Sequence, residues 1–534
     1  MVRSDKKSIF FFISVIFISL YSFYLSSINS IYNQDFHHWS YVLQSFIDYK
    51  NNLKLFKEIT ITHGFGQIIL FSLIDNFKKI DLVSIGTISA FFYSINFIII
   101  YKIFTIITSR IISLILVFIL FLIHPFIILP WADYYSGLCV NLFIYFFLKC
   151  NKGNITFFFV LSLLLLLSIF FRSTYIISIF LSILTYLILN YKFIKKNHFN
   201  VFFYIFFFQI FIFFIFLNYY NNFYLWFSQS ILFIKNLLLV SSNPIKEEII
   251  SNYSLDIWIL LKFIYQLLRT FASLFNVLNA NNIIFLIFFL LNIKIIFKIK
   301  KIFHKENINN NKIFYISLLG LFGFIQSFHS YEIFRNINAT TGIFFAGIYY
   351  FKYLKIIKYC KIKIVKLSIS LFFSIIVFAL IFNFNKNLSL IESYKINKSN
   401  YTTLNNFFFG DKKINKNAAN HYNQLHNILC GNNIKIINFT PDYAITYLCN
   451  NNQNSQPFYI TSRDSKNLMP ENLRIVYERI FLQGIIKKNE IVLTIESIDT
   501  SIYKDITHIS TIHTGHDLNI WHLPRLINIY KLKD

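Results

Sequence analysis

The sequence has few charged residues, few glycines and prolines, and few cysteines, and each shortage excludes a class of protein. Charged residues make up 14% of the 534 positions, whereas soluble domains carry roughly 25%. This shortage excludes a soluble enzyme and a disordered chain. The 13 glycines and 7 prolines exclude a collagen-like scaffold. Five cysteines are too few for a disulfide scaffold, and none follow the Cys-x-x-Cys spacing that holds a metal.

Apolar and aromatic residues take the place of the missing charges. Hydrophobic residues make up 56% of the chain, including 68 Phe and 34 Tyr, and the mean hydropathy is +0.55. A helix needs about 20 mostly apolar residues to cross a bilayer. The sequence therefore predicts an α-helical polytopic membrane protein with about 11 transmembrane helices in residues 1–384. The predicted spans are 9–29, 82–101, 111–129, 134–149, 155–171, 174–190, 200–218, 282–298, 313–329, 337–353 and 366–384.

The net charge of +26 would indicate a nucleic-acid partner in a soluble protein, but the positions of the basic residues indicate membrane orientation instead. Threading the spans from a cytoplasmic N-terminus leaves 21 Lys and Arg and only two acids in the inner segments, while the outer turns show no basic excess. This is the positive-inside pattern. We therefore expect no nucleic-acid partner, a cytoplasmic N-terminus and a C-terminal part outside the membrane.

The C-terminal residues 385–534 mix acidic and basic residues and alternate short apolar runs with helical patterns, which predicts an exoplasmic α/β domain. The expected helices cover 420–429, 441–449 and 471–488, and the expected strands cover 434–439, 458–461 and 491–495. Cys430 and Cys449 both lie in this domain. In an oxidising compartment they are either bridged or two buried thiols, and the sequence leaves both alternatives open.

Ionisable residues gather in the segments that this topology places outside. They occur in the first outer loop (31–80), after the third span, between the fifth and sixth spans, and between the ninth and tenth. Each has an ordinary explanation as an interfacial anchor, a solvated charge or a local ion pair. Their convergence on one side of nearly charge-free spans makes them functional candidates. They are Asp35, His37, His38, Trp39, His63, Asp133, Arg172, Glu332 and Arg335.

The first outer loop also contains an apolar pattern over Ser40–Phe56, which predicts a helix lying in the membrane interface. Adjacent histidines rarely reach one ion, and no His-Glu-x-x-His spacing occurs, so we assign no metal site.

The layout resembles the C-type glycosyltransferase superfamily, in which a first span, an outer-loop Asp, an interfacial helix, many further spans and a C-terminal exoplasmic domain follow in this order. The resemblance is sharpest over about fifty residues. Two positions depart from the family pattern: Asp35 lacks a second acid beside it, and His63 stands where Tyr is commoner. The similar segments are Asp35-Phe36-His37-His38-Trp39, Leu55-Phe56-Lys57-Glu58, His63-Gly64-Phe65-Gly66, Pro130-Trp131-x-Asp133, Arg335-x-x-Asn338, Ile437-Asn438-Phe439-Thr440, Asp442 with Tyr447-Leu448, and Gln456-Pro457-Phe458.

The resemblance implies an inverting transfer of sugar from a polyprenyl-phosphate donor lipid to a glycan, lipid or protein acceptor, at the outer face of a bacterial cytoplasmic membrane. Asp35 would be the general base for the acceptor hydroxyl, and His37 or His38 would orient it. Arg335, then Arg172, would bind the donor phosphate. Asp133 would be a second acid or help hold a divalent cation such as Mg²⁺ or Mn²⁺. Trp39, His63 and Glu332 would complete the substrate-binding residues.

Three alternatives remain open on the sequence. The first is a glycan ligase or polymerase of the same pathway, although such proteins usually carry their large outer loop between late spans. The second is a transporter or flippase, although the spans have few of the Gly and Pro residues that break transporter helices. The third is a non-enzymatic membrane protein whose C-terminal domain binds a partner.

Overall fold

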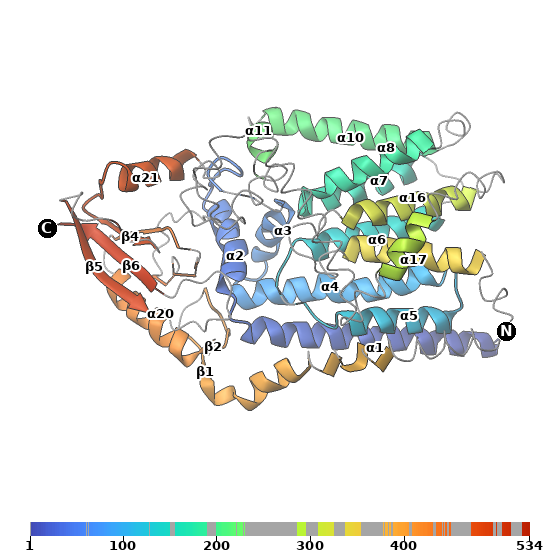
Figure 1. The fold of residues 1–534 in the computed structure, drawn as a ribbon, viewed down its shortest axis with the longest axis horizontal. Helices are drawn as coiled ribbons and strands as arrows, with labels where there is room; N and C mark the ends of the chain where they lie inside the picture. The colour runs from blue at the N-terminus through green and yellow to red at the C-terminus, as the bar shows by residue number, and fades with distance from the viewer. Residues whose placement is uncertain are drawn as a thin grey trace.

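The computed structural model of the chain is mostly helical, with a small β-sheet region near the C-terminus (Figure 1). The structure describes residues 2–59, 61, 64–127, 129–149, 155–189, 199–219, 222–227, 229, 286–294, 308–324, 337–353, 377–378, 380–382, 384–385, 388–404, 408–430, 434–440, 442, 444–445, 448–449, 471–494, 498, 505–513 and 526–533.

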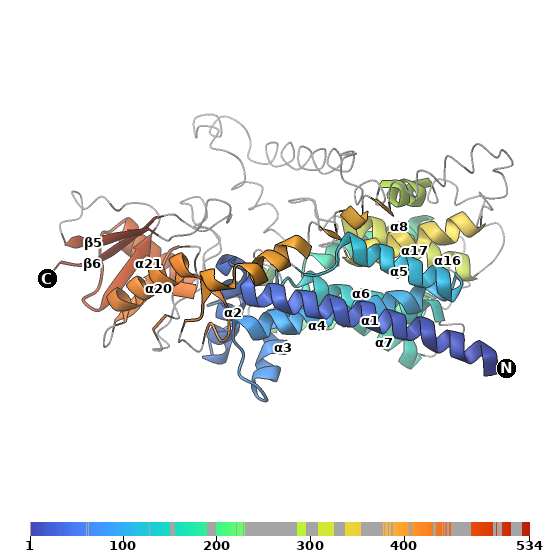
Figure 2. The ribbon, with the colours of Figure 1, turned by 90° about the horizontal axis from the view of Figure 1, so that it is seen from below.

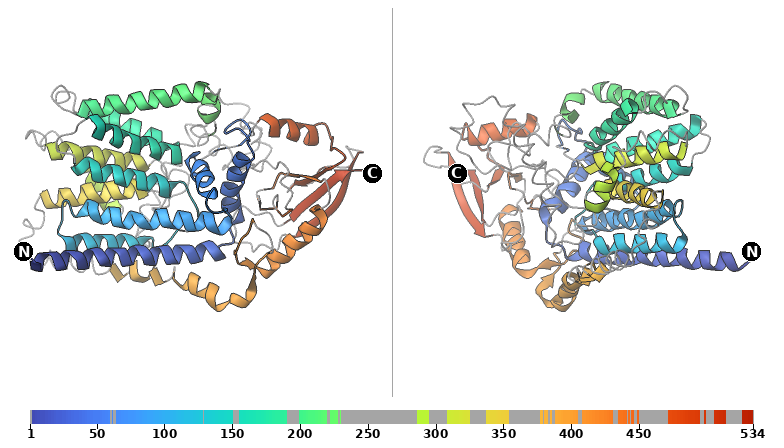
Figure 3. Two further views of the ribbon diagram at one scale, coloured as in Figure 1. Left: turned by 180° about the vertical axis from the view of Figure 1, so that it is seen from behind. Right: turned by 45° about the vertical axis from the view of Figure 1, so that its right-hand side comes forward.

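Long apolar helices run back and forth beside one another and form a bundle (Figures 1 and 3). Helix α4 packs against α1, α5 and α6, and α6 also packs against α7 and α17. Further contacts join α16 to α8 and α17, and α10 to α7. The bundle helices are α1 (Val2–Tyr32), α4 (Leu82–Phe104), α5 (Arg110–Ile123), α6 (Asp133–Lys149), α7 (Ile155–Phe171), α8 (Tyr175–Leu189), α10 (Phe199–Tyr219), α16 (Ile308–Gly323) and α17 (Ile337–Tyr353).

Three helical stretches are long and apolar enough to cross a membrane, namely Ile9–Tyr32, Leu82–Phe104 and Val201–Tyr219, and several shorter apolar helices accompany them. The outer surfaces of these helices expose large apolar side chains, such as Phe10 of α1 and Phe208 of α10, which suits contact with lipid. These features are those of a membrane protein. The described helices begin and end within six residues of the predicted span boundaries, except at the start of α1. The predicted number of eleven spans is not confirmed, and much of 282–298 and 366–384 lies outside the described residues.

Local chemistry explains where several helices begin and end. Asp81 precedes α4, and its carboxylate accepts a hydrogen bond from the backbone N–H of Ser84, which satisfies one of the free donors of the first turn. Helix α5 ends at Ile123, earlier than the predicted boundary at 129, because Pro125 cannot continue the helix.

Two short helices lie at one end of the bundle, between it and the C-terminal region (Figures 1 and 2). They are α2 (Phe36–Lys50) and α3 (Gly66–Asp75), which pack against each other. Helix α2 begins four residues before the predicted interfacial helix, and it is almost completely buried, including the polar side chains of Gln44 and Asp48. Gln44 Nε2 donates to Asp48 Oδ2 over 3.0 Å, so these polar groups are paired inside the structure. A one-turn helix, α11 (Phe223–Trp226), lies at the same end.

The C-terminal region contains a four-stranded sheet in the order β3-β4-β6-β5. Strands β3 and β4 are parallel and joined through helix α21, and the other neighbouring pairs are antiparallel. A two-stranded antiparallel pair, β1 with β2, precedes this sheet. The elements are β1 (Tyr401–Thr402), β2 (Ile414–Asn415), α20 (Lys416–Leu429), β3 (Lys435–Asn438), α21 (Glu471–Phe481), β4 (Glu490–Thr494), β5 (Ile506–His513) and β6 (Leu526–Leu532).

The predicted elements of this region are partly confirmed. Helices α20 and α21 and strands β3 and β4 lie where expected, but α21 ends at Phe481 and not at residue 488. The chain turns at Gly484, whose positive φ of 68° ends helical geometry. The expected helix over 441–449 is wrong as an α-helix, because its described residues adopt one 3₁₀ turn at Ala444–Ile445 and a bend. The expected strand 458–461 lies outside the described residues.

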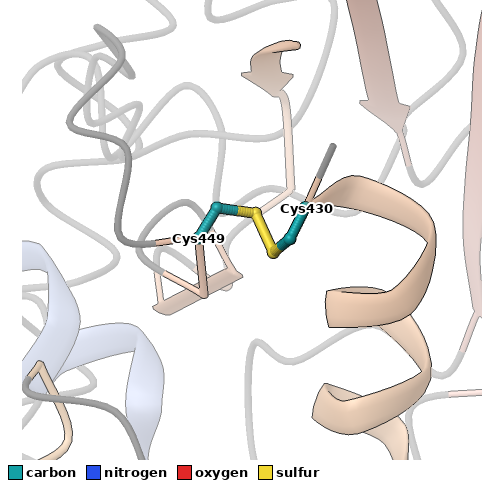
Figure 4. Close-up of a disulfide and its surroundings, with 2 residues drawn as sticks. All are labelled: Cys430 and Cys449. Carbon is teal, nitrogen blue, oxygen red and sulfur yellow. A yellow bond between two sulfur atoms is a disulfide. The ribbon is translucent and has the colours of Figure 1, made fainter. Parts of the chain in front are cut away.

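A disulfide joins Cys430, directly after α20, to Cys449 (Figure 4). The sequence left a bridge and two buried thiols open, and the structure contains the bridge. It ties the end of α20 to the turn that follows β3, so it fixes one side of the sheet to the helix. Among the described residues, Cys139 is a buried free thiol.

Candidate functional site

The acid–histidine cluster of the first outer loop lies at the junction of α1 and α2. Asp35 is the last residue before α2, it is half-buried, and its backbone N–H donates to Asn33 Oδ1 over 2.8 Å. An acid at this position suits the positive end of the helix dipole. His37 and His38 belong to the first turn of α2 and not to a loop; their side chains lie outside what the structure describes.

Trp39 is fully buried in the first turns of α2. Its ring lies so close to Gly86 of α4 that a Cβ on this glycine would overlap it. The candidate substrate-binding tryptophan is therefore packed between two helices. Its ring also contacts a charged residue from the distant C-terminal part of the chain, Lys412.

Lys412 is fully buried against the α1–α2 junction. Its ammonium group donates to the carbonyl of Ser30 over 2.8 Å. The same Nζ lies 4.4 Å from the ring centroid of Trp39 and 5.7 Å from that of Phe36, within the range of a cation–π interaction. A cation from near the C-terminus thus completes the surroundings of the first outer loop.

Residues 408–415, which we call the docking segment, hold Lys412 in this position. The backbone N–H of Lys413 donates to Ile31 O over 2.9 Å, and the N–H of Leu82 donates to Phe408 O over 3.1 Å. Gln34 makes two further contacts, donating from Nε2 to Lys413 O over 2.8 Å and accepting from the N–H of Asn415 over 3.0 Å. The segment therefore contacts both the end of α1 and the start of α4.

A tight turn at Gly410 lets the docking segment approach α4. Its φ of 55° lies in the left-handed region that favours glycine, and a Cβ there would overlap the carboxylate of Asp81. Asp81 therefore both caps α4 and lies against the docking segment.

The electrostatics of Lys412 result from two opposed effects. Burial lowers the pKa of Lys412 to about 7, because an ammonium ion loses hydration in a buried position. The negative charges of Asp35 and Asp81 oppose this effect and favour the protonated form. Lys412 is therefore a group whose charge changes near neutral pH, next to the proposed general base.

A second polar cluster lies inside the same end of the bundle. Arg172 Nε lies 3.6 Å from Asp133 Oδ1, and both side chains are buried. Asp133 begins α6, where a carboxylate suits the helix dipole, and Arg172 follows the last residue of α7. The charge of Asp133 also acts on Tyr175, whose buried hydroxyl has no hydrogen-bond partner among the described residues.

Helix α3 connects this ion pair to α2. Gln67 at its start donates to the carbonyl of Pro130 over 3.1 Å. Gly64 and Gly66 lie against the backbone of Phe170 and Phe171, so closely that a Cβ at Gly64 would overlap a carbonyl oxygen. These two glycines therefore allow two backbones to approach beside the ion pair.

The structure thus brings Asp133 and Arg172 together, and it places Asp35 and Trp39 with Lys412. His63, Glu332 and Arg335 lie outside the described residues. Within the ranges that are described, no three His, Cys, Asp or Glu side chains come together as a metal site.

Sequence reasoning missed Lys412, Asp81 and Tyr175. Asp81 carried a visible signal, since an acid directly before an apolar helical run predicts an N-cap. Lys412 lies in an Asp-Lys-Lys run that is typical of a solvated surface, so only the contact with α1 and α2 reveals its role. No protein-family model matches the chain, and no curated protein matches it in a sequence comparison.

Proposed function

We propose that the chain is a membrane glycosyltransferase that moves a sugar from a polyprenyl-phosphate-linked donor to an acceptor, with Asp35 as the general base. The observation that carries this proposal is the position of Asp35. It is a half-buried carboxylate directly after the first membrane-length helix, where the bundle meets the C-terminal region. The resemblance of the surrounding motifs to C-type glycosyltransferases supports the same assignment.

The proposed chemistry is a single displacement at the anomeric carbon. The acceptor oxygen forms the new bond, its proton passes to the carboxylate of Asp35, and the lipid phosphate leaves with the bonding electron pair. A positioned general base contributes roughly 10²–10⁴-fold to such a reaction. The growing negative charge on the phosphate needs a cation, for which Arg335 is the candidate. Arg172 is a weaker candidate, because Asp133 already offsets its charge.

The burial of Lys412 beside Asp35 favours a second candidate function. In this alternative the protein is a non-enzymatic membrane protein, and Asp35 serves only to hold the docking segment against the bundle. Under the alternative, removing the charge of Asp35 weakens docking, and the intact chain transfers no sugar.

The test compares Asp35→Asn with Asp411→Asn in the full chain reconstituted into liposomes. Asp411 is exposed and adjacent to Lys412 in the sequence, so it provides the same chemical change nearby at an exposed position. The donor is a polyprenyl-phosphate carrying a radiolabelled sugar, and the acceptor is the cell-envelope fraction of a strain that lacks the gene.

We expect Asp35→Asn to reduce transfer by about a hundredfold or more and Asp411→Asn to leave it unchanged. Hydrogen exchange of the docking segment in Asp35→Asn shows whether the loss follows undocking. Transfer at the wild-type rate by Asp35→Asn would exclude Asp35 as the base. If the wild-type chain transfers none of a panel of such donors, the non-enzymatic alternative replaces the proposal.

A further inference from the structure

A groove lies in the C-terminal region, between α20 and β5. Its volume is about 660 Å³, within the roughly 300–1,000 Å³ typical of small-molecule sites. Helix α20 forms one wall with residues spaced three, four and seven apart, which places them on a single helix face. These residues are Asn417, Asn420, His421, Gln424, Asn427 and Ile428, and residues 510–513 of β5 form the other wall.

The helix that carries this face is held firmly by its opposite side. Tyr422 and Leu425 are fully buried, and the Tyr422 hydroxyl donates to Asp442 Oδ2 over 2.7 Å. The disulfide from Cys430 fixes the C-terminal end of the helix. The amide side chains of the groove face therefore extend from a rigid element, which is what a binding surface requires.

The chemistry of the lining selects one class of ligand. Among the described residues that line the groove, the helix wall carries four amide side chains and Ile428, and the strand wall carries the hydroxyl of Ser510 and the side chain of Ile512. The Thr511 hydroxyl is already hydrogen-bonded to Asn528 Oδ1. Amides and hydroxyls both donate and accept hydrogen bonds, which matches a ligand with many hydroxyl groups. Two histidines also line the groove, the buried His421, which is 2% exposed, and the exposed His513.

The residue types that do not line the groove exclude other ligands. The described residues that line the groove include no Lys or Arg, which phosphate or nucleic acid would need. They include no Phe, Tyr or Trp on which a nucleobase could stack.

We infer that this groove binds an uncharged oligosaccharide through the amide face of α20 and the Ser510 hydroxyl of β5. That this oligosaccharide is the acceptor of sugar transfer rests on the proposed function. The groove and Asp35 then have separate roles: the groove holds the acceptor glycan, and the α1–α2 junction carries the proposed base. The two are connected because α20 directly follows the docking segment.

The binding test uses the purified full chain in lipid nanodiscs. The probes are maltoheptaose, chitohexaose and a galactan hexasaccharide as uncharged oligosaccharides, a polygalacturonate fragment as an acidic one, and an uncharged peptide of similar length. Affinities are compared between the wild type, Asn420→Ala/Gln424→Ala, and Asn423→Ala. Asn423 is an exposed amide of the same helix that does not line the groove, so it provides a matched control.

We expect at least one uncharged probe to bind, about tenfold or more weakly to the double variant, and equally to Asn423→Ala. Ser510→Ala removes a hydroxyl from the opposite wall and tests the same groove if the double variant does not fold. The inference is overturned if no uncharged probe binds, if only the acidic fragment or the peptide binds, or if all variants bind alike.

The outcome separates the groove from the proposed enzyme activity. Binding that the double variant weakens, in a chain that transfers no sugar, supports the groove and contradicts the transferase. If the double variant transfers sugar with the wild-type rate and the wild-type KM for the acceptor, the groove does not bind the acceptor. Asp35 is then still the proposed base.

Discussion

Lys412→Met provides the sharpest test of how the docking segment is held, because it replaces a buried titrating group with an apolar side chain of similar length. In the docked state burial lowers the pKa of Lys412 to about 7, whereas an exposed lysine has a pKa of about 10.4. Between these two pH values the undocked state binds more protons than the docked state. Docking therefore becomes more stable as the pH rises through this window.

The magnitude follows from the two pKa values. Each pH unit above the lower pKa adds at most about 1.4 kcal/mol to the free energy that favours docking. Docking is therefore more stable by about 2 kcal/mol at pH 9 than at pH 7. The charged groups that act on Lys412 are Asp35 and Asp81. Lys412→Met has no titrating group at this position and should show no such gain.

Hydrogen exchange measured by mass spectrometry reports docking, because the backbone N–H groups of Lys413 and Asn415 donate across the interface. Protection is expressed relative to the intrinsic exchange rate at each pH. We expect protection of residues 408–415 to rise by a factor of about 30 from pH 7 to pH 9 in the wild type. The same pH dependence in wild type and Lys412→Met would refute the assignment of this effect to Lys412.

Three further predictions concern stability, measured by thermal unfolding of the detergent-solubilised chain followed by tryptophan fluorescence. Arg172→Met should cost about 3–5 kcal/mol, because it leaves Asp133 as a buried, uncompensated charge, and adding Asp133→Asn should recover most of the loss. Cys430→Ser should cost the C-terminal region about 3 kcal/mol, because the bridge to Cys449 spans 19 residues and restricts the unfolded chain. Gly410→Ala should cost about 1–2 kcal/mol from its left-handed backbone alone, with a further loss from overlap with a neighbouring carboxylate.

Each of these predictions has a contradicting result. If adding Asp133→Asn to Arg172→Met gives no recovery, charge pairing is not the source of the loss. Unchanged unfolding of the Cys430→Ser chain would show that the bridge does not restrict the unfolded state. An alanine at position 410 without effect would mean that the turn adapts to a Cβ.

The helices of the bundle could be predicted from the sequence because each is a long apolar run. A helix needs such a run whether it is surrounded by protein or by lipid. Their ends were predicted less accurately, because the span predicted over 111–129 ran past Pro125, before which α5 ends. The order of strands could not be predicted, since β6 lies between β4 and β5 although it follows both in the sequence. The pairing of Cys430 with Cys449 was one of two alternatives, because sequence spacing does not place two sulfur atoms in space.

The site was predictable only in part, because several of its residues contact partners that are far away in the sequence. Asp35 and Asp133 stood out as acids beside apolar runs. That Arg172 pairs with Asp133 depends on how α6 and α7 pack, which hydropathy does not encode. The position of Lys412 depends on a contact with Ser30, 382 residues earlier.

The same separation sets an order for assembly during synthesis. Ribosomes add about 5–20 residues per second, so roughly 20–80 s pass between the emergence of Ser30 and that of Lys412. For that interval the ring of Trp39 and the carboxylate of Asp81 lack the cation that later covers them. The first segment to be made is therefore among the last to reach its final surroundings, and a ribosome that stops before residue 408 leaves a bundle whose α1–α2 junction stays open.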